Sequence, residues 1–218
     1  QHSLTQCIKI AIMKKVKVTF LSVFIVLNAH LCFAAPYASI VIDADTGKVL
    51  HFENANTRLH PAGLTKLATL YAAFEAVETR EIDLEAKARI SLKAANEELA
   101  ALGMREGQRV SIRDLIRATA IKGANDTSTA LAEAISGSEQ AFTKRLDETA
   151  KEVGLSRSTF KNAHGLTEKG HLSTASDMAF IMKAIADDFT NYLFVLGLIR
   201  VSVTQAAIDT FNSVHGTN

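Results

Sequence analysis

The chain has 218 residues, carries 24 Lys and Arg against 23 Asp and Glu, and is 48% hydrophobic. This composition is that of a globular protein and excludes a collagen, a disulfide scaffold and a long disordered chain. The formal net charge of +1 lacks the basic excess that binding to phosphate backbones requires, so no nucleic-acid partner is expected.

The first segment, residues 1–35, has the polarity of an export signal. It contains no Asp or Glu, and from Met13 a basic stretch (14–17) precedes an apolar run (18–27) and small residues at 34–35. The run is shorter than the ~20 residues that cross a bilayer. We therefore predict an N-terminal extension and a cleaved signal peptide. The protein is expected in the periplasm or cell envelope, with membrane contact only through the signal segment if that segment stays uncleaved.

Two β-rich runs and a helix follow. Residues 37–42 and 48–52 flank the turn sequence Asp-Ala-Asp-Thr-Gly at 43–47, which predicts a hairpin. Beyond Pro61 the apolar spacing changes to the period of a helix, and this helix is predicted to run to about Thr79.

The remainder of the chain is predicted to be mostly helical. Ser111 followed by Asp114 resembles a capping box before a helix. Helices are also expected over 127–135 and 138–153, each followed by a glycine, and another begins near Thr174. The inward positions of this last helix are predicted to be Met178, Ile181, Met182 and Ile185.

Residues 36–190 are predicted to form one domain, because no repeat, low-complexity tract or Gly/Ser linker divides them. Only the two strands of the hairpin are expected in it. The last segment, 191–218, differs in composition: a dense apolar run over 192–203 precedes a polar end. We treat it as an atypical tail.

Two short strings carry the functional information. Residues 61–66 read Pro-Ala-Gly-Leu-Thr-Lys, and residues 122–125, about sixty positions later, read Lys-Gly-Ala-Asn. They resemble the Pro-Ala-Ser-Leu-Thr-Lys and Ser-Ala-Asn motifs of the serine-type D-alanyl-D-alanine carboxypeptidases, the low-molecular-weight penicillin-binding proteins. Further strings are similar to the same family in the same order, and they lie at 37–48, 160–166 and 174–179.

The resemblance implies the α/β serine-transferase fold of penicillin-binding proteins and β-lactamases. It would comprise an N-terminal strand hairpin and a helical cluster, with the C-terminal strands missing from this chain. The family removes the terminal D-alanine of peptidoglycan stem peptides through an acyl-enzyme, with no cofactor and no metal. By resemblance, Gly63 occupies the nucleophile position, Lys66 is the general base, Gly123 occupies the relay-serine position and Asn125 binds substrate.

This sequence departs from the family pattern at three places. Glycine replaces serine at positions 63 and 123, and no Lys-Thr-Gly occurs anywhere in the chain. Thr65 is expected on another helix face, while Thr127 and Ser128 lie past the asparagine. The sequence therefore predicts a degenerate, C-terminally truncated copy whose catalysis is lost and whose binding of stem peptides or β-lactams is weak or lost.

The sequence also allows other interpretations of the function and of single residues. The chain could be a non-catalytic protein that binds peptidoglycan or a cell-wall partner, or a truncated product without function. Lys66 could be a solvated helix lysine and Asn125 a helix cap. His164 is interpreted as a structural loop residue, and Glu97 and Glu98 as a solvated face. Four other histidines show no metal-ligand spacing and are read as surface or structural, namely His51, His60, His171 and His215.

Overall fold

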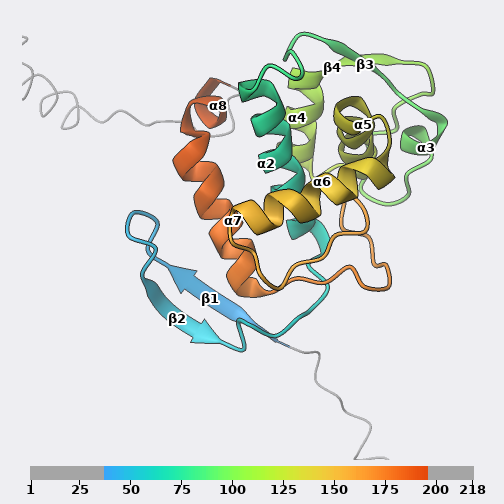
Figure 1. The fold of residues 1–218 in the computed structure, drawn as a ribbon. Helices are drawn as coiled ribbons and strands as arrows, with labels where there is room; N and C mark the ends of the chain where they lie inside the picture. The colour runs from blue at the N-terminus through green and yellow to red at the C-terminus, as the bar shows by residue number, and fades with distance from the viewer. Residues whose placement is uncertain (1–36, 196–218) are drawn as a thin grey trace, which may run out of the picture. The chain divides into compact units, whose positions relative to one another are not determined.

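The computed structural model describes residues 37–195 (Figure 1). The predicted export signal, and the predicted tail from residue 196 onward, lie outside the described residues. None of the described helices is long and apolar enough to cross a membrane.

The predicted N-terminal hairpin is confirmed. Strands β1 (Ser39–Ile42) and β2 (Val49–Glu53) pair antiparallel, with Ser39 opposite Glu53. Asp43 closes the turn, because its Oδ1 accepts two hydrogen bonds from Thr46. The backbone N–H of Thr46 donates at 2.8 Å and the Thr46 hydroxyl donates at 2.6 Å. Within the described part of the chain the other edge of β1 has no strand beside it.

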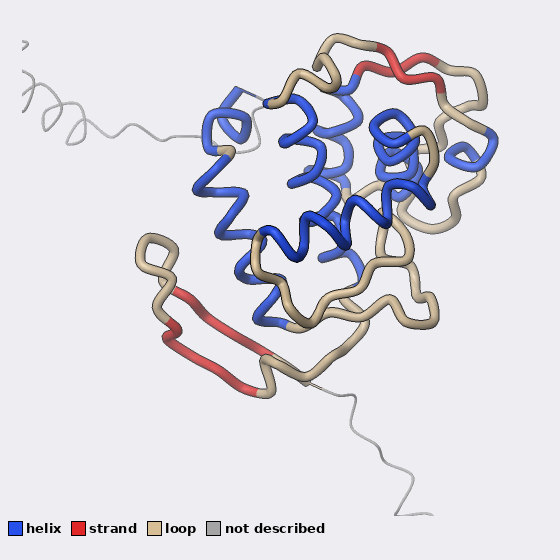
Figure 2. The backbone as a smooth tube through the Cα atoms, in the orientation of Figure 1, coloured by secondary structure: helices blue, strands red, loops and turns tan. Residues whose placement is uncertain are grey.

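A second two-stranded sheet corrects the expectation of a single hairpin. Strands β3 (Lys87–Arg89) and β4 (Arg109–Ser111) pair antiparallel. They lie on the side of the helices opposite to the β1–β2 hairpin (Figure 2). The short helix α3 (Leu92–Ala95) follows β3. Strands of three residues are too short to show an alternating pattern, which explains why the sequence did not indicate them.

The helical cluster contains most of the predicted helices. Its elements are the 3₁₀ turn η2 (Ala62–Leu64) and the helices α2 (Thr65–Glu78), α4 (Ile112–Lys122), α5 (Asn125–Ser136), α6 (Glu139–Glu152), α7 (Ala175–Asp188) and α8 (Thr190–Val195). The predicted helix starts at Ser111 and near Thr174 are confirmed: the Ser111 side chain accepts the Asp114 N–H, and the Thr174 side chain accepts the Asp177 N–H.

Helix α2 runs through the middle of this cluster and contacts α4, α5, α6 and α7 (Figure 1). Its small residues Ala72 and Ala73 are fully buried, which lets the neighbouring helices approach closely. The core around them includes the fully buried Phe74, Leu131 and Phe142. This packing fixes the first turn of α2, where the two sequence motifs meet.

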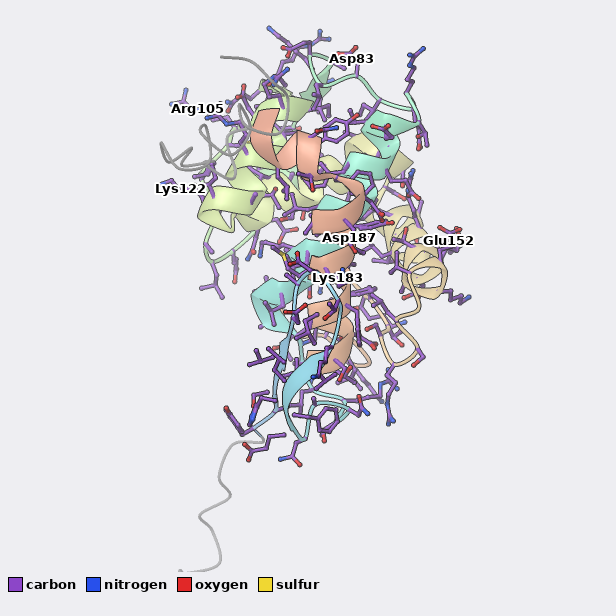
Figure 3. All side chains as sticks on the ribbon, turned by 90° about the vertical axis from the view of Figure 1, so that its left-hand side faces the viewer. Asp83, Arg105, Lys122, Glu152, Lys183 and Asp187 are labelled. Atoms are coloured by element: carbon purple, nitrogen blue, oxygen red, sulfur yellow. The ribbon has the colours of Figure 1, made fainter. Side chains whose placement is uncertain are left out.

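Helix α7 has two apolar faces, one buried in the core and one exposed. The sequence pattern did not distinguish them. Ile181 and Ile185 are buried as predicted, but the inward prediction for Met182 is wrong, since 47% of it is exposed. Met182 lines an apolar groove between α7 and β1. On the same helix Lys183 points toward Asp187, with Nζ 2.8 Å from Oδ2 (Figure 3).

The chain continues to pack on the cluster beyond α7. The rings of Phe189 and Tyr192 contact Phe74, with centroids 5.6 and 5.9 Å away. The domain boundary at residue 190 remains a prediction, because most of the predicted tail lies outside the described residues.

Candidate active site

Lys66 joins the two sequence motifs. It is the second residue of α2 and is buried, with 7% of its surface exposed. Its Nζ donates to Oδ1 of Asn125 at 2.8 Å and to the backbone carbonyl of His164 at 2.6 Å. The structure thus brings together Lys66 and Asn125 as the resemblance implied, and the reading of Lys66 as a solvated lysine is wrong.

The surroundings of Lys66 favour the neutral amine. Burial lowers the pKa of Lys66 below its usual value. Both acceptors of its hydrogen bonds are uncharged, and within residues 37–195 no carboxylate forms an ion pair with it. A lowered pKa brings the amine closer to the neutral form that a general base requires.

Asn125 connects the lysine to the loop that follows α3. It is the first residue of α5, and Ala124 is the N-cap, so the reading of Asn125 as the cap is wrong. Its Nδ2 donates to the carbonyls of Glu98 and Leu99, both at 3.1 Å. Both hydrogens of the side-chain amide are therefore used within the protein.

The two positions that carry serine in the family offer open space. Gly63 lies exposed in η2, and a Cβ added to it meets nothing within 4 Å. Gly123 ends α4 in the left-handed conformation, with φ of +63°, and a Cβ there also meets nothing within 4 Å. Neither position therefore supplies a hydroxyl, and no neighbouring atom fills the space.

Nearby hydroxyls do not replace the missing ones. Thr65 is fully buried and its Oγ1 lies 2.8 Å from Nε2 of His171. Thr127 and Ser128 are buried, and both donate to the carbonyl of Ala124. The prediction that these three residues do not restore the constellation agrees with their placement.

The loop over residues 160–166 places the carbonyl that Lys66 uses. Asn162 Oδ1 accepts the N–H of Gly165 at 2.7 Å, and its Nδ2 donates to the carbonyl of Leu166 at 2.9 Å. Gly165 packs against the backbone of Ala62, the residue before position 63. Sequence reasoning missed this role because a backbone acceptor has no side-chain signature.

His164 lies on a buried pair of carboxylates. Its Nε2 is 3.5 Å from Oε2 of Glu97 and 3.5 Å from Oε1 of Glu139. The side chain of Glu97 is only 10% exposed, so its prediction as part of a solvated face is wrong. His164 is buried, as expected for a structural loop residue, and burial lowers the pKa of its imidazole.

These three side chains do not fit a metal ion, although their ligand atoms lie within 4.8 Å of one another. His164 Nδ1 accepts the N–H of Leu166 at 3.1 Å, so the proton of the neutral ring is on Nε2. That nitrogen therefore presents a hydrogen, not a lone pair, to Glu97 and Glu139. Lys93 also occupies Oε2 of Glu139 at 2.5 Å.

The burial of His171 predicts that the free energy of unfolding depends on pH. It is 1% exposed, its Nδ1 accepts the N–H of Lys161, and burial lowers its pKa to about 4. Between pH 6.5 and 4 the unfolded chain binds a proton that the folded chain excludes. The free energy of unfolding should therefore fall by about 3 kcal/mol as the pH falls through this range.

Urea unfolding between pH 4 and 8 measures this effect. We expect His171→Asn to have a shallower pH slope than the parent protein, while His51→Asn, at an exposed position, should keep the parental slope. Equal pH slopes for the parent and His171→Asn would contradict the attribution of this pH dependence to His171.

The geometry as a whole defines a class of site. A buried lysine on the first turn of a helix, three positions after residue 63, is held by an asparagine that opens a second helix. This is the Ser-x-x-Lys and Ser-x-Asn arrangement of serine acyl-transferring proteins, with both serines replaced.

Comparisons with known proteins agree with this class. A family model described as D-alanyl-D-alanine carboxypeptidase matches residues 31–206. D-alanyl-D-alanine carboxypeptidase DacF of Bacillus subtilis is 40% identical over 148 residues, which are 68% of this chain and 38% of DacF. The chain belongs to the D-alanyl-D-alanine carboxypeptidase family.

Solved structures show the same fold. The carboxypeptidase DacD from Francisella tularensis aligns with a TM-score of 0.69 and 32% identity, over 72% of this chain and 38% of DacD. Penicillin-Binding Protein D2 from Listeria monocytogenes, solved in a cefotaxime-bound form, aligns at 0.59 and 26% identity over 74% of this chain and 67% of D2. The α/β penicillin-binding-protein fold expected from the sequence is confirmed, and the chain spans less than half the length of DacF and DacD.

Proposed function

We propose that this chain is an exported D-alanyl-D-alanine carboxypeptidase homologue that acts in peptidoglycan metabolism without hydrolysing the stem peptide. One observation carries the proposal. The base, Lys66, is held in place by Asn125 and His164, but residue 63 offers it no hydroxyl to deprotonate.

The chemistry explains why this single absence matters most. Acyl transfer through a covalent intermediate needs a nucleophile beside the base. In a serine hydrolase, removal of the nucleophile alone lowers turnover about 10⁶-fold, because the members of the site act as a unit. Gly123 supplies no relay hydroxyl either.

Substrate binding is proposed to be weakened as well. The amide of Asn125, which would orient a peptide, already donates both hydrogens to the carbonyls of Glu98 and Leu99. A stem peptide or β-lactam would have to replace these bonds, and breaking such bonds offsets much of the free energy gained.

Release of D-alanine tests the proposal. The full chain is incubated with a synthetic peptide ending in D-alanyl-D-alanine, beside an active family member as positive control. We expect no release above the protein-free blank. Release of several equivalents of D-alanine per protein molecule by the parent chain, lost in the Lys66→Arg variant, would overturn the proposal.

A further inference from the structure

The sheet formed by β3 and β4 presents basic side chains on its outer face. Ala88 and Val110, which lie opposite each other, pack against the core. Because side chains alternate along a strand, Lys87, Arg89 and Arg109 lie on the other face, and all three are exposed. This face is at the end of the helical cluster away from the β1–β2 hairpin (Figure 1). The small sheet thus carries three cations on the side turned away from the core.

The two arginines of this face repel each other. Arg89 and Arg109 are direct cross-strand partners. Like charges directly opposite each other destabilise a sheet. Neither arginine forms an ion pair with a carboxylate of residues 37–195. An anion bound from outside the protein would offset this repulsion.

The turn before β4 adds a further cation beside the pair. The N–H of Gln108 donates to the carbonyl of Arg105 at 3.0 Å and closes the turn. A Cβ added to Gly107 would lie 3.8 Å from a guanidinium nitrogen of Arg89, so this guanidinium lies over the turn. Arg105 is exposed and has no ion pair among the described residues either. The two strands and the turn together contain four cations and one carboxylate, that of Glu106.

Exposed leucines accompany these cations in the chain. Leu92, three residues after Arg89, is 58% exposed, and Leu102, three residues before Arg105, is 52% exposed. A dissolved anion gains nothing from an apolar side chain, whereas a lipid surface binds apolar and cationic side chains together. The combination therefore favours a lipid surface over a soluble anion.

We propose that the outer face of β3 and β4 is a contact surface for membranes that contain anionic phospholipids. The guanidinium groups of Arg89, Arg105 and Arg109 donate to the phosphate oxygens of the headgroups, for which their planar shape is suited. Lys87 adds a further positive charge near the same surface. This contact is additional to the one expected through the predicted signal segment, and it does not depend on the loss of catalysis.

Vesicle flotation with matched charge variants tests this surface. The full chain is mixed with vesicles of phosphatidylglycerol and phosphatidylcholine, or of phosphatidylcholine alone, and the bound fraction is measured. The parent is compared with the double variant Arg89→Glu, Arg109→Glu. The control of equal net charge is Lys144→Glu, Lys151→Glu, which changes two exposed lysines of α6. The predicted signal segment is identical in all three proteins, so its own affinity for lipid cancels in the comparison.

The arginine variant should lose binding to anionic vesicles selectively. Each basic residue near an anionic surface strengthens binding about fivefold, so this variant should need at least about tenfold more anionic lipid for half-binding. The lysine variant should stay within about threefold of the parent. The difference should shrink between about 10 and 150 mM salt, because the screening length falls from about 30 to about 8 Å. Equal losses in the two charge variants would overturn the proposal.

A soluble polyanion separates a lipid surface from phosphate alone. Leu92→Ala should weaken binding to the anionic vesicles and leave binding to dissolved polyphosphate unchanged. Polyphosphate that binds the parent as tightly as the vesicles do, at equal phosphate concentration, with no effect of Leu92→Ala on either, would show a site for phosphate polymers and overturn the membrane assignment.

Discussion

Gly165→Ala is expected to lower the free energy of unfolding by more than about 4 kcal/mol or to prevent folding. A Cβ at this position would lie 1.8 Å from the carbonyl oxygen of Ala62 and 2.9 Å from Oγ1 of Thr65. The φ of Gly165 is +93°, a conformation that side chains rarely adopt. Because the nearest atoms belong to the backbone, no side-chain rotation can relieve the overlap.

The surroundings also prevent the loop from moving away. The N–H of Gly165 donates to Asn162 at 2.7 Å, and the preceding carbonyl accepts Lys66. Gly137→Ala is the matched control: its φ is +77°, but an added Cβ meets nothing within 4 Å. This variant should lose only about 1 kcal/mol in urea unfolding. Equal losses for the two variants would contradict the close packing of Gly165 on Ala62.

Gly63→Ser alone is expected to remain at least about 10⁴-fold below an active family member in D-alanine release, because site members that act as a unit are not restored singly. The variant should fold, since the added Cβ meets no atom within 4 Å. The relay position remains glycine.

The double variant tests the same point further. Gly123→Ser is not sterically blocked, but the φ of +63° places a serine in the left-handed region at a cost of about 1 kcal/mol. We expect Gly63→Ser combined with Gly123→Ser to fold with reduced stability. A single Gly63→Ser variant with a turnover near that of the relative, and an unchanged thermal midpoint, would show that the relay hydroxyl missing at position 123 is dispensable.

Local sequence signals predicted most of the helices and the hairpin because their causes are local. A serine or threonine followed three residues later by aspartate marked the starts of α4 and α7, and the structure shows the capping bonds at Ser111 and Thr174. Gly137, in the left-handed conformation, ends α5 as expected. The three-residue strands β3 and β4 carry no such signal.

The site was only partly predictable, because the sequence pattern indicates contacts between residues that are close in the chain but not between distant ones. The spacing of residues 63 and 66 on a helix follows from the chain itself, whereas the partners of Lys66 come from positions 59 and 98 residues away. Glu97 shows the consequence most clearly. Its charge suggested solvent exposure, but the fold buries it against His164 and Thr129, whose hydroxyl donates to it at 2.8 Å.

The site holds Lys66 in place but has no hydroxyl beside it to acylate. The most direct measurement is the intact mass of the full chain after saturating labelled penicillin, before and after alkaline hydroxylamine, which cleaves esters of serine and threonine and leaves amides of lysine intact. We expect no hydroxylamine-sensitive adduct. One equivalent of hydroxylamine-sensitive penicilloyl ester per protein molecule would contradict it.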